Sequence, residues 1–293
     1  MFSGSIVALV TPMRADGAVD YSALDRLVDF HVANGTDAIV AVGTTGESPT
    51  LDVEEHMAVV HRVYTRAAGH VPVIAGTGAN STREAIELTV MAEKIGVAGC
   101  LVVTPYYNKP TQEGLYQHYK AVAASVTLPL ILYNVPGRTG VDMKPDTVVR
   151  LSAIKNIVGI KEASGSLERN RELKARFGDS FVLLGGDDDI GCESILAGFN
   201  GVISVTANIA PRAMHDMCAA ALAGDAARAR AIDATLSGLH KYLFIESNPV
   251  PAKWALARMG FMEDVVRLPL TPLSDACKPP VLEALKQAGI AFA

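Results

Sequence analysis

A lysine ends one of the apolar segments of the sequence, where an amine could act as a nucleophile. Lys161 follows the run Ile157 to Ile160, and two-residue alternation along a strand would place it on the face of Ile157 and Gly159, opposite Ile160 and Glu162. An apolar interior favours the neutral amine, which is the form that attacks a ketone to give a Schiff base. We therefore predict a Schiff-base lysine. The alternative is a lysine that only extends from a strand end toward solvent.

Three hydroxyl side chains are candidates for proton transfer beside this amine. Tyr133 ends another strand-like segment, where the same alternation points it inward and a phenol could act as a general acid and base. Thr44 lies in a glycine-rich turn, and its hydroxyl can accept and donate a hydrogen bond at once. Tyr107 is the third candidate. Each residue taken singly also suits a core tyrosine or a turn threonine, so the prediction depends on their meeting at one site.

An arginine in a turn could bind a substrate carboxylate. Arg138 follows Pro136 and Gly137, and its planar guanidinium can hold a carboxylate through two hydrogen bonds. An arginine that simply lies on the surface is an alternative of equal weight for Arg138. The glycines around Thr44 and Thr45 would let backbone N–H groups approach a second carboxylate closely, although such turns are common. The seven histidines lack the spacing of metal ligands, so we expect no metal.

Short apolar segments alternate with longer segments that have helical periodicity, so these residues would be positioned by strands joined through helices. Because the strands are nearly continuous in Val, Ile and Leu, both of their faces should be covered. Eight units predict an α/β fold, a closed (β/α)8 TIM barrel, over residues 1–224; a flavodoxin-like open sheet is the alternative. The predicted strands are Ile6–Val10, Ala38–Val42, Val71–Ala75, Gly99–Thr104, Leu128–Tyr133, Ile157–Lys161, Phe181–Gly185 and Gly201–Val205.

The alternation stops near residue 224, and residues 225–293 have the pattern of a C-terminal α-helical domain. Helix starts are expected after Thr50 and at Ser81, which begins a capping box that ends at Glu84. In a (β/α)8 barrel the catalytic groups lie where strands end and loops begin. The candidate lysine, tyrosines, threonines and arginine all follow predicted strands, which places them at one rim.

Composition limits the possible partners. The chain has 293 residues, 49% hydrophobic and 19% charged, and a net charge of -5. It lacks the basic clusters of a nucleic-acid-binding protein, and no apolar run reaches the roughly 20 residues of a membrane span. The four cysteines lie far apart, which suits reduced thiols in the cytoplasm. We expect a small-molecule ligand, with no nucleic acid and no membrane as partner.

Four segments contain most of the candidate residues. They are Gly43-Thr44-Thr45-Gly46-Glu47, Tyr106-Tyr107-Asn108-Lys109-Pro110, Tyr133-Asn134-Val135-Pro136-Gly137-Arg138-Thr139 and Gly159-Ile160-Lys161-Glu162-Ala163. Together these segments resemble a known family, the dihydrodipicolinate (4-hydroxy-tetrahydrodipicolinate) synthases of the pyruvate-dependent class I aldolase superfamily. The resemblance covers essentially the whole chain, and any one segment is shared with the wider superfamily.

The resemblance implies an activity and a set of roles. Lys161 would form an imine with pyruvate, and the derived enamine would attack L-aspartate 4-semialdehyde to give 4-hydroxy-tetrahydrodipicolinate, the committed step of diaminopimelate and lysine biosynthesis. Tyr133 would be the acid and base, with Thr44 and Tyr107 as its relay. No cofactor is implied.

The family also implies contacts for the two substrates and an assembly. Thr45 would bind the pyruvate carboxylate and Arg138 the semialdehyde carboxylate, while main-chain groups of Gly186 and Ile203 would line the pocket. Tyr107 would reach into the site of a neighbouring subunit. The expected assembly is a homo-oligomer, a tetramer built as a dimer of dimers.

Feedback-inhibited members of the family bind L-lysine at the tight-dimer interface. This sequence departs from them at Val53, where some relatives have a histidine, and at Pro49, which replaces a small residue. We still expect inhibition by L-lysine. The matching positions are Ser48, Pro49, His56, Asn80, Glu84 and Tyr106.

Two other activities share part of this pattern. N-acetylneuraminate lyase and 2-keto-3-deoxy sugar acid aldolases share Lys161, Tyr133 and the Gly-Thr-Thr-Gly-Glu turn, but their substrates are long and hydroxylated. Arg138 suits a short second carboxylate better. A non-catalytic protein that binds pyruvate or lysine is the other alternative, and the intact set of candidate residues argues against it.

Overall fold

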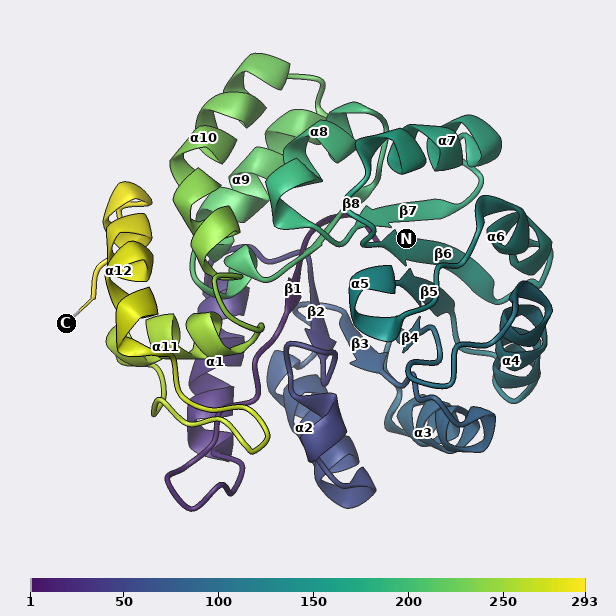
Figure 1. The fold of residues 1–293 in the computed structure, drawn as a ribbon, viewed down its shortest axis with the longest axis horizontal. Helices are drawn as coiled ribbons and strands as arrows, with labels where there is room; N and C mark the ends of the chain where they lie inside the picture. The colour runs from purple at the N-terminus through teal and green to yellow at the C-terminus, as the bar shows by residue number, and fades with distance from the viewer. Residues whose placement is uncertain (1, 293) are drawn as a thin grey trace.

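Eight parallel strands close into a barrel at the centre of the molecule (Figure 1). The computed structural model describes residues 2–292. Each strand pairs with the next along the chain, and β8 pairs with β1, so the predicted (β/α)8 barrel is confirmed and the open sheet is excluded. The strands are β1 Gly4–Ala8, β2 Ala38–Ala41, β3 Val73–Gly76, β4 Gly99–Val103, β5 Leu130–Asn134, β6 Ile157–Glu162, β7 Val182–Gly185 and β8 Gly201–Ser204.

All eight strands fall where the apolar segments predicted them, with ends that coincide or differ by at most two residues. The first strand was expected over Ile6–Val10 but begins at Gly4, because Gly4 pairs with Gly201 of β8. Strand ends depend on partners that are distant in the sequence, and for this reason a local pattern defines them poorly.

Helices surround the barrel, as the periodic segments predicted (Figure 1). Ser81 caps the third helix as expected, whereas the second is capped by Asp52, two residues after the expected Thr50. The helices are α1 Tyr21–Ala33, α2 Val53–Ala67, α3 Thr82–Ile95, α4 Gln112–Ala124, α5 Pro136–Thr139, α6 Pro145–Ser152, α7 Leu167–Phe177, α8 Gly191–Leu196, α9 Pro211–Leu222, α10 Ala226–Tyr242, α11 Val250–Arg258 and α12 Lys278–Gln287.

Apolar side chains form two separate buried layers on the two faces of the strands. Ile6, Val40 and Leu184 belong to the layer inside the barrel. Val7 and Ile39 belong to the layer between the strands and the helices. Because both faces are buried, the strands are apolar without alternation, as parallel barrels require.

The simple alternation predicted for β6 is wrong at its start. Leu130 of β5 pairs with Ile157, but the next residue, Ile131, pairs with Gly159, so Val158 is an extra residue in the ladder. This bulge shifts the phase by one residue. Ile157 therefore lies in the outer layer and Val158 packs against the inner one, although Ile157 was expected on the face of Lys161.

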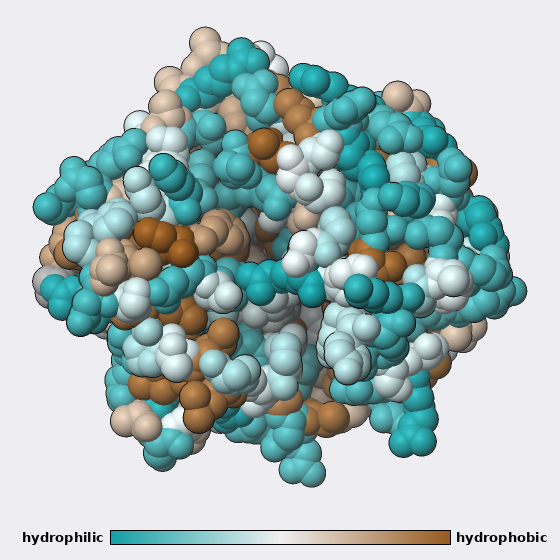
Figure 2. Space-filling model, in the orientation of Figure 1, coloured by the Kyte–Doolittle hydropathy of each residue, from teal (hydrophilic) through white to brown (hydrophobic). Residues whose placement is uncertain are grey.

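The C-terminal part is helical, as expected. α10 packs along α9, and α12 packs against α10. A turn with Gly224 in the left-handed region joins α9 to α10, and the proposed domain boundary at residue 224 stays a prediction. The face of the molecule seen in Figure 2 is mainly hydrophilic and is hollowed near its centre. Within residues 2–292, no helix has both the length and the apolar character needed to cross a bilayer.

Candidate active site

A cavity of about 70 Å³ lies where the barrel strands end. It brings together most of the residues that the sequence marked for catalysis and substrate binding, from four different units of the barrel. It also includes residues that the sequence reasoning missed. The predicted residues among its walls are Thr44, Thr45, Tyr133, Arg138, Lys161 and Gly186; the missed ones include Asp187, Val205, Phe244 and Asn248.

Lys161 is buried beside Tyr133. The two residues pair across β5 and β6, and Lys161 Nζ lies 4.3 Å from the centre of the Tyr133 ring. Only 6% of Lys161 is exposed, and no ion pair to it is found among residues 2–292. Gly186 makes room for it, since a Cβ at this glycine would lie 2.8 Å from Lys161 Cε and 2.6 Å from Ala163 Cβ. The amine is therefore buried in the cavity wall without an ion pair among the described residues, and the Asp187 carboxyl group, which lines the same cavity, is near enough to interact with its charge.

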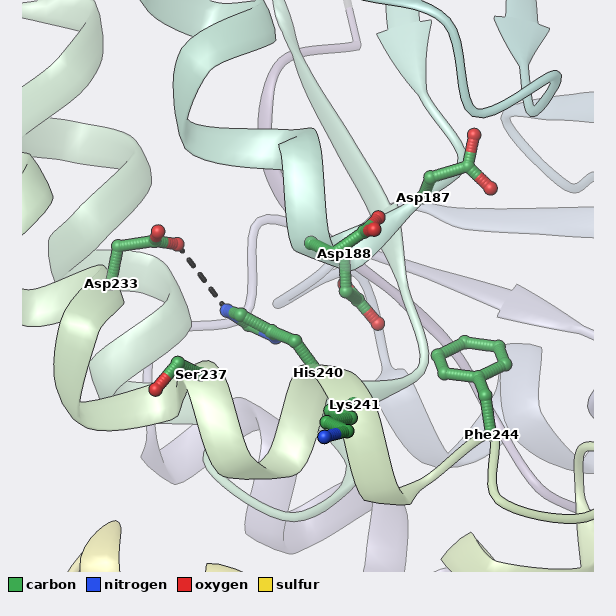
Figure 3. A pocket seen from close by; sticks show the side chains of 8 residues that line it. Asp187, Asp188, Asp233, Ser237, His240, Lys241 and Phe244 are labelled. Carbon is green, nitrogen blue, oxygen red and sulfur yellow. Dashed lines mark hydrogen bonds and ion pairs between the residues drawn. The ribbon is translucent and has the colours of Figure 1, made fainter.

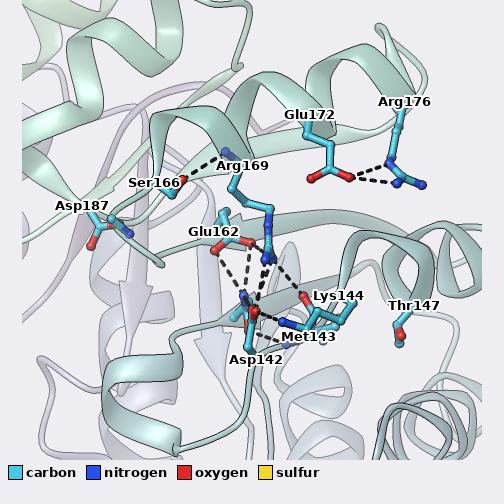
Figure 4. Close-up of polar contacts among 12 residues, drawn as sticks. Asp142, Met143, Lys144, Thr147, Glu162, Ser166, Arg169, Glu172, Arg176 and Asp187 are labelled. Carbon is cyan, nitrogen blue, oxygen red and sulfur yellow. Dashed lines mark hydrogen bonds and ion pairs between the residues drawn. The ribbon is translucent and has the colours of Figure 1, made fainter.

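Asn134 and Glu162, the next residues of the same two strands, do not line the cavity and belong to a polar cluster; Figure 4 labels its members Glu162, Asp142, Lys144 and Arg169. Asn134 Nδ2 donates to both carboxylate oxygens of Glu162 at 3.2 Å, and to Asp142 at 2.9 Å. Arg169 binds Asp142 through two hydrogen bonds and lies 3.9 Å from Glu162. This cluster joins β5 to β6 directly behind Tyr133 and Lys161.

Burial and charge act differently on the two carboxyl groups of this cluster. Burial raises the pKa of Glu162 to about 7, against the opposing effect of its hydrogen bonds and of Arg169. Burial acts in the same direction on Asp142, but hydrogen bonds from Arg169, Lys144 and Asn134 outweigh it and lower the pKa to about 2. The cluster therefore holds one carboxylate and one carboxyl group that titrates near neutral pH.

The turn that carries Thr44 and Thr45 has a strained backbone. The N–H of Gly46 donates to Gly43 O, and the N–H of Glu47 donates to Thr44 O. Val42 and Glu47, at the two ends of the turn, have φ of 54° and 57°, which is the left-handed region. This conformation is rare for a β-branched residue, so surrounding contacts must maintain it.

Residues after α10 complete the wall of the cavity. Asn248 is buried; its Nδ2 donates to Thr45 Oγ1 at 2.9 Å, and its backbone oxygen accepts from Arg138 Nη2 at 3.3 Å. Asn248 Oδ1 has no partner among the described residues. No sequence signal marked Asn248, because it lies outside the strand-and-loop pattern in a segment between two helices.

Tyr107 does not join this cavity within one chain. Its side chain is 89% exposed, and its φ is 73°. The neighbouring Tyr106 is half-buried; burial raises the pKa of its phenol, and Glu84 adds to this effect. Asn108 donates to the backbone oxygen of Asn80 at 2.8 Å, which ties the segment of Tyr107 to the start of α3.

The predicted effector residues come from the segment after the Thr44 turn, from α2, from the start of α3 and from the segment after β4. Ser48 lines a small cavity together with Thr44 and Tyr133. His56 is buried, with Nε2 2.7 Å from Gly76 O, and burial lowers its pKa, so the ring is neutral. Pro49 and Glu84 are exposed.

An acidic depression of about 580 Å³ adjoins the catalytic cavity, and the two share Asp187 and Phe244 (Figure 3). Burial raises the pKa of Asp187, an effect that the Gly165 N–H and Lys161 oppose. His240 contacts Asp233, with Nε2 3.3 Å from Oδ1. Burial lowers the pKa of this histidine, but its acidic neighbours outweigh burial and raise the pKa.

Ile203, like Tyr107, is a predicted residue that does not line the cavity. It is 1% exposed and packs in the layer inside the barrel. Among residues 2–292, no group of three or more His, Cys, Asp or Glu side chains is arranged to hold a metal ion.

The chain is similar to known proteins over nearly all of its length. The model of the dihydrodipicolinate synthetase family matches residues 1–288. A 4-hydroxy-tetrahydrodipicolinate synthase of Pseudomonas syringae is 60% identical over 99% of both chains.

Two solved structures share the fold. A chloride-inhibited dihydrodipicolinate synthase of Acinetobacter baumannii, complexed with pyruvate, is 55% identical, with a TM-score of 0.98 over 99% of this chain and 100% of that one. An enzyme of Cyanidioschyzon merolae with lysine bound is 39% identical, with a TM-score of 0.96 over 99% of both chains. The chain therefore belongs to the dihydrodipicolinate synthetase family and is a lyase of lysine biosynthesis.

Proposed function

We propose that the chain condenses pyruvate with L-aspartate 4-semialdehyde through a Schiff base at Lys161. The observation that carries the proposal is the buried amine of Lys161 in the cavity beside Tyr133. At this position the amine can reach the ketone carbon of a substrate held in the cavity, which is what imine formation requires. The pyruvate bound to the Acinetobacter baumannii enzyme supports this substrate.

The steps follow from imine chemistry. The Lys161 amine adds to the ketone carbon of pyruvate, and water leaves to form the imine. Loss of a methyl proton gives an enamine, whose carbon bonds to the aldehyde carbon of the semialdehyde while the aldehyde oxygen takes a proton. The amino group of the second substrate then attacks the imine carbon, closes the ring and releases Lys161, giving 4-hydroxy-tetrahydrodipicolinate.

The residues around the cavity have matching roles. Tyr133, beside the amine, exchanges the protons, and Thr44 in the same cavity relays them. Thr45 binds the carboxylate of pyruvate, main-chain groups of Gly186 and Ile203 complete the pocket, and Arg138 at the rim binds the second carboxylate. The reaction needs no cofactor, because the imine nitrogen accepts the electron pair.

Borohydride reduction in the presence of pyruvate tests the imine. The reduced adduct should be found by mass spectrometry on the peptide that contains Lys161, and a lack of any adduct would favour the non-catalytic binding protein. Turnover of L-aspartate 4-semialdehyde, measured beside cleavage of N-acetylneuraminate and of 2-keto-3-deoxy sugar acids, tests the substrate. Faster cleavage of a sugar acid would overturn the proposal.

We also propose that the active unit is an oligomer, a tetramer built as a dimer of dimers. The observation is Tyr107, a relay candidate with an exposed side chain that does not reach the cavity of its own chain. In the proposed dimer it enters the site of the partner. Mixing Tyr107→Phe with Lys161→Ala subunits should then restore sites that carry both intact residues. No gain of activity on mixing would contradict this arrangement.

L-lysine is the proposed inhibitor, and the lysine-bound Cyanidioschyzon merolae structure supports it. The exposed carboxylate of Glu84 and the Tyr106 phenol beside it would receive the ammonium groups, next to the turn that carries Ser48 and Pro49. His56 and Asn80 complete the site. Glu84→Gln should raise the half-inhibitory lysine concentration at least about tenfold, with Arg83→Gln as control. Unchanged turnover at millimolar lysine would contradict the proposed inhibition. We also propose that the enzyme works in the cytoplasm, together with the other enzymes of the pathway.

A further inference from the structure

A second buried lysine lies behind the Thr44–Thr45 turn. Lys253 of α11 is fully buried, and its Nζ forms an ion pair with Glu47, which is 2% exposed. The second carboxylate oxygen of Glu47 accepts from the backbone N–H of Arg267 at 3.1 Å. Burial lowers the pKa of Lys253, and Glu47 opposes this effect. A charge pair this deep is retained at a high desolvation cost, which is seldom repaid in stability alone.

The ion pair meets the turn at its strained end. Glu47 itself is the left-handed residue that follows Gly46, and a Cβ at Gly46 would lie 2.9 Å from the Cα of Val42. The turn therefore cannot relax by moving closer to the strand before it. Thr11 Oγ1 donates to Gly46 O at 2.7 Å and holds the turn from the barrel side. The Glu47 carboxylate is held from the C-terminal side.

Asn248 makes a second connection from the same C-terminal segment, two residues before α11 begins. It donates to the Thr45 hydroxyl and accepts from Arg138. Lys253 and Asn248 are thus joined through one turn of α11, and both contact the loop that carries the proposed pyruvate-binding and relay threonines. The C-terminal helices reach the reaction site through these two contacts.

We propose that the Lys253–Glu47 ion pair and the Asn248–Thr45 hydrogen bond position the Thr44–Thr45 turn for pyruvate. Lys253 and Glu47 are positioning residues: they hold the turn in its strained conformation and do not touch the substrate. The inference rests on the proposed role of Thr45 as a ligand of the pyruvate carboxylate. It gives the C-terminal helices a function within one subunit, separate from assembly.

Steady-state kinetics of Lys253→Met, Glu47→Gln and the double variant test the proposal, at a temperature where circular dichroism shows each variant folded. The KM for pyruvate should rise at least about tenfold in the single variants. The KM for the semialdehyde should change much less, because Arg138 lies on a different loop. The conservative Glu47→Asp should recover part of the loss. Asn248→Ala breaks the second contact without leaving a buried charge, and tests the proposal if the Lys253 variants do not fold.

The matched control is Arg62→Ala, which removes an ion pair with Asp25 on the surface. It should leave both KM values unchanged. Folded variants with an unaltered KM for pyruvate, or a loss of kcat that follows only the folded fraction, would overturn the inference. Borohydride trapping of the wild type and of Arg62→Ala, done in parallel, reports separately on the proposed Schiff base, so its failure is distinguishable from failure of the positioning role.

Discussion

The molecule buries two lysines in opposite settings. Lys253 is paired with Glu47 at the junction of α11 and the Thr44–Thr45 turn, whereas Lys161 lies in the barrel against the ring of Tyr133 without an ion pair among the described residues. Both are at most 6% exposed. Burial is therefore the shared feature, and the carboxylate partner is the difference.

This difference separates a structural amine from a reactive one. The Nζ of Lys253 is held by the Glu47 carboxylate and does not line the catalytic cavity, so it cannot reach a ketone there. Lys161 has no ion pair among residues 2–292, and its amine lines the cavity beside Tyr133, where it can attack a ketone. The carboxylate next to Lys161 in sequence, Glu162, lies on the opposite face of β6 and contacts Arg169 and Asn134 instead.

Replacing Lys161 should give the largest effect on activity. Lys161→Met removes the nucleophile and should lower kcat at least about 10³-fold and abolish borohydride trapping. The free energy of unfolding should stay within about 1 kcal/mol of wild type, since a flexible apolar chain of similar length replaces an uncompensated amine. Steady-state turnover and urea denaturation check the two parts. An adduct that persists in this variant would refute the role of Lys161.

Sequence reasoning identified one of these lysines and missed the other for physical reasons. Lys161 ends an apolar run at a predicted strand end, where the barrel rule assigns catalytic groups, so its position could be predicted without its neighbours. Lys253 lies in a helix after two prolines, and nothing local distinguishes it from a surface lysine. Only the contact with Glu47, 206 residues away, reveals its burial.

The same dependence on contacts distant in the sequence explains the other features that the sequence did not predict. The barrel and its strands followed from local composition, because parallel strands covered on both faces are continuously apolar. The bulge at Val158 and the place of Asn248 in the cavity wall depend on register and tertiary packing, which leave no local signature. Tyr107 is exposed in one chain, and its proposed role requires a partner subunit, which no local sequence pattern describes.

Breaking the buried pair should give the largest effect on stability. Lys253→Met leaves Glu47 charged and buried, and should lower the free energy of unfolding by about 3 kcal/mol. Adding Glu47→Gln removes the second charge, so the double variant should lose less than the sum of the two single losses, with a coupling of about 1–3 kcal/mol. Urea denaturation of the wild type, the two single variants and the double variant completes this double-mutant cycle. Additive losses would show that the two side chains do not interact across the turn.

Glu162 lies between the two lysines in the strength of its pairing: it is a buried acid, and the guanidinium of Arg169 is 3.9 Å from its carboxylate. Its pKa is raised from 4.5 to about 7. Between these values the folded protein holds a proton that the unfolded chain has lost, so stability should fall as the pH rises from about 4.5 to about 7, by up to about 3 kcal/mol. Asp142, Lys144 and Arg169 face the same cluster, and the lowered pKa of Asp142 keeps it charged across this window.

Glu162→Gln isolates this contribution, because glutamine imitates the protonated form. Urea denaturation at pH 5 and pH 7.5 should show the variant gaining stability relative to wild type at the higher pH. A difference that is equal at both pH values would mean that Glu162 titrates outside this range.

Removing a surface ion pair should have the smallest effect on the free energy of unfolding, and it serves as the reference for the two buried lysines. Arg62 binds Asp25 with side chains that are 48% and 18% exposed, so water already solvates both groups in the unfolded and folded states. Arg62→Ala should therefore change the free energy of unfolding by at most about 1 kcal/mol, and less in 1 M salt. A loss comparable to that of Lys253→Met in the same urea experiments would mean that the carboxylate partner matters irrespective of burial, and the contrast drawn between Lys253 and Lys161 would then need a cause other than desolvation.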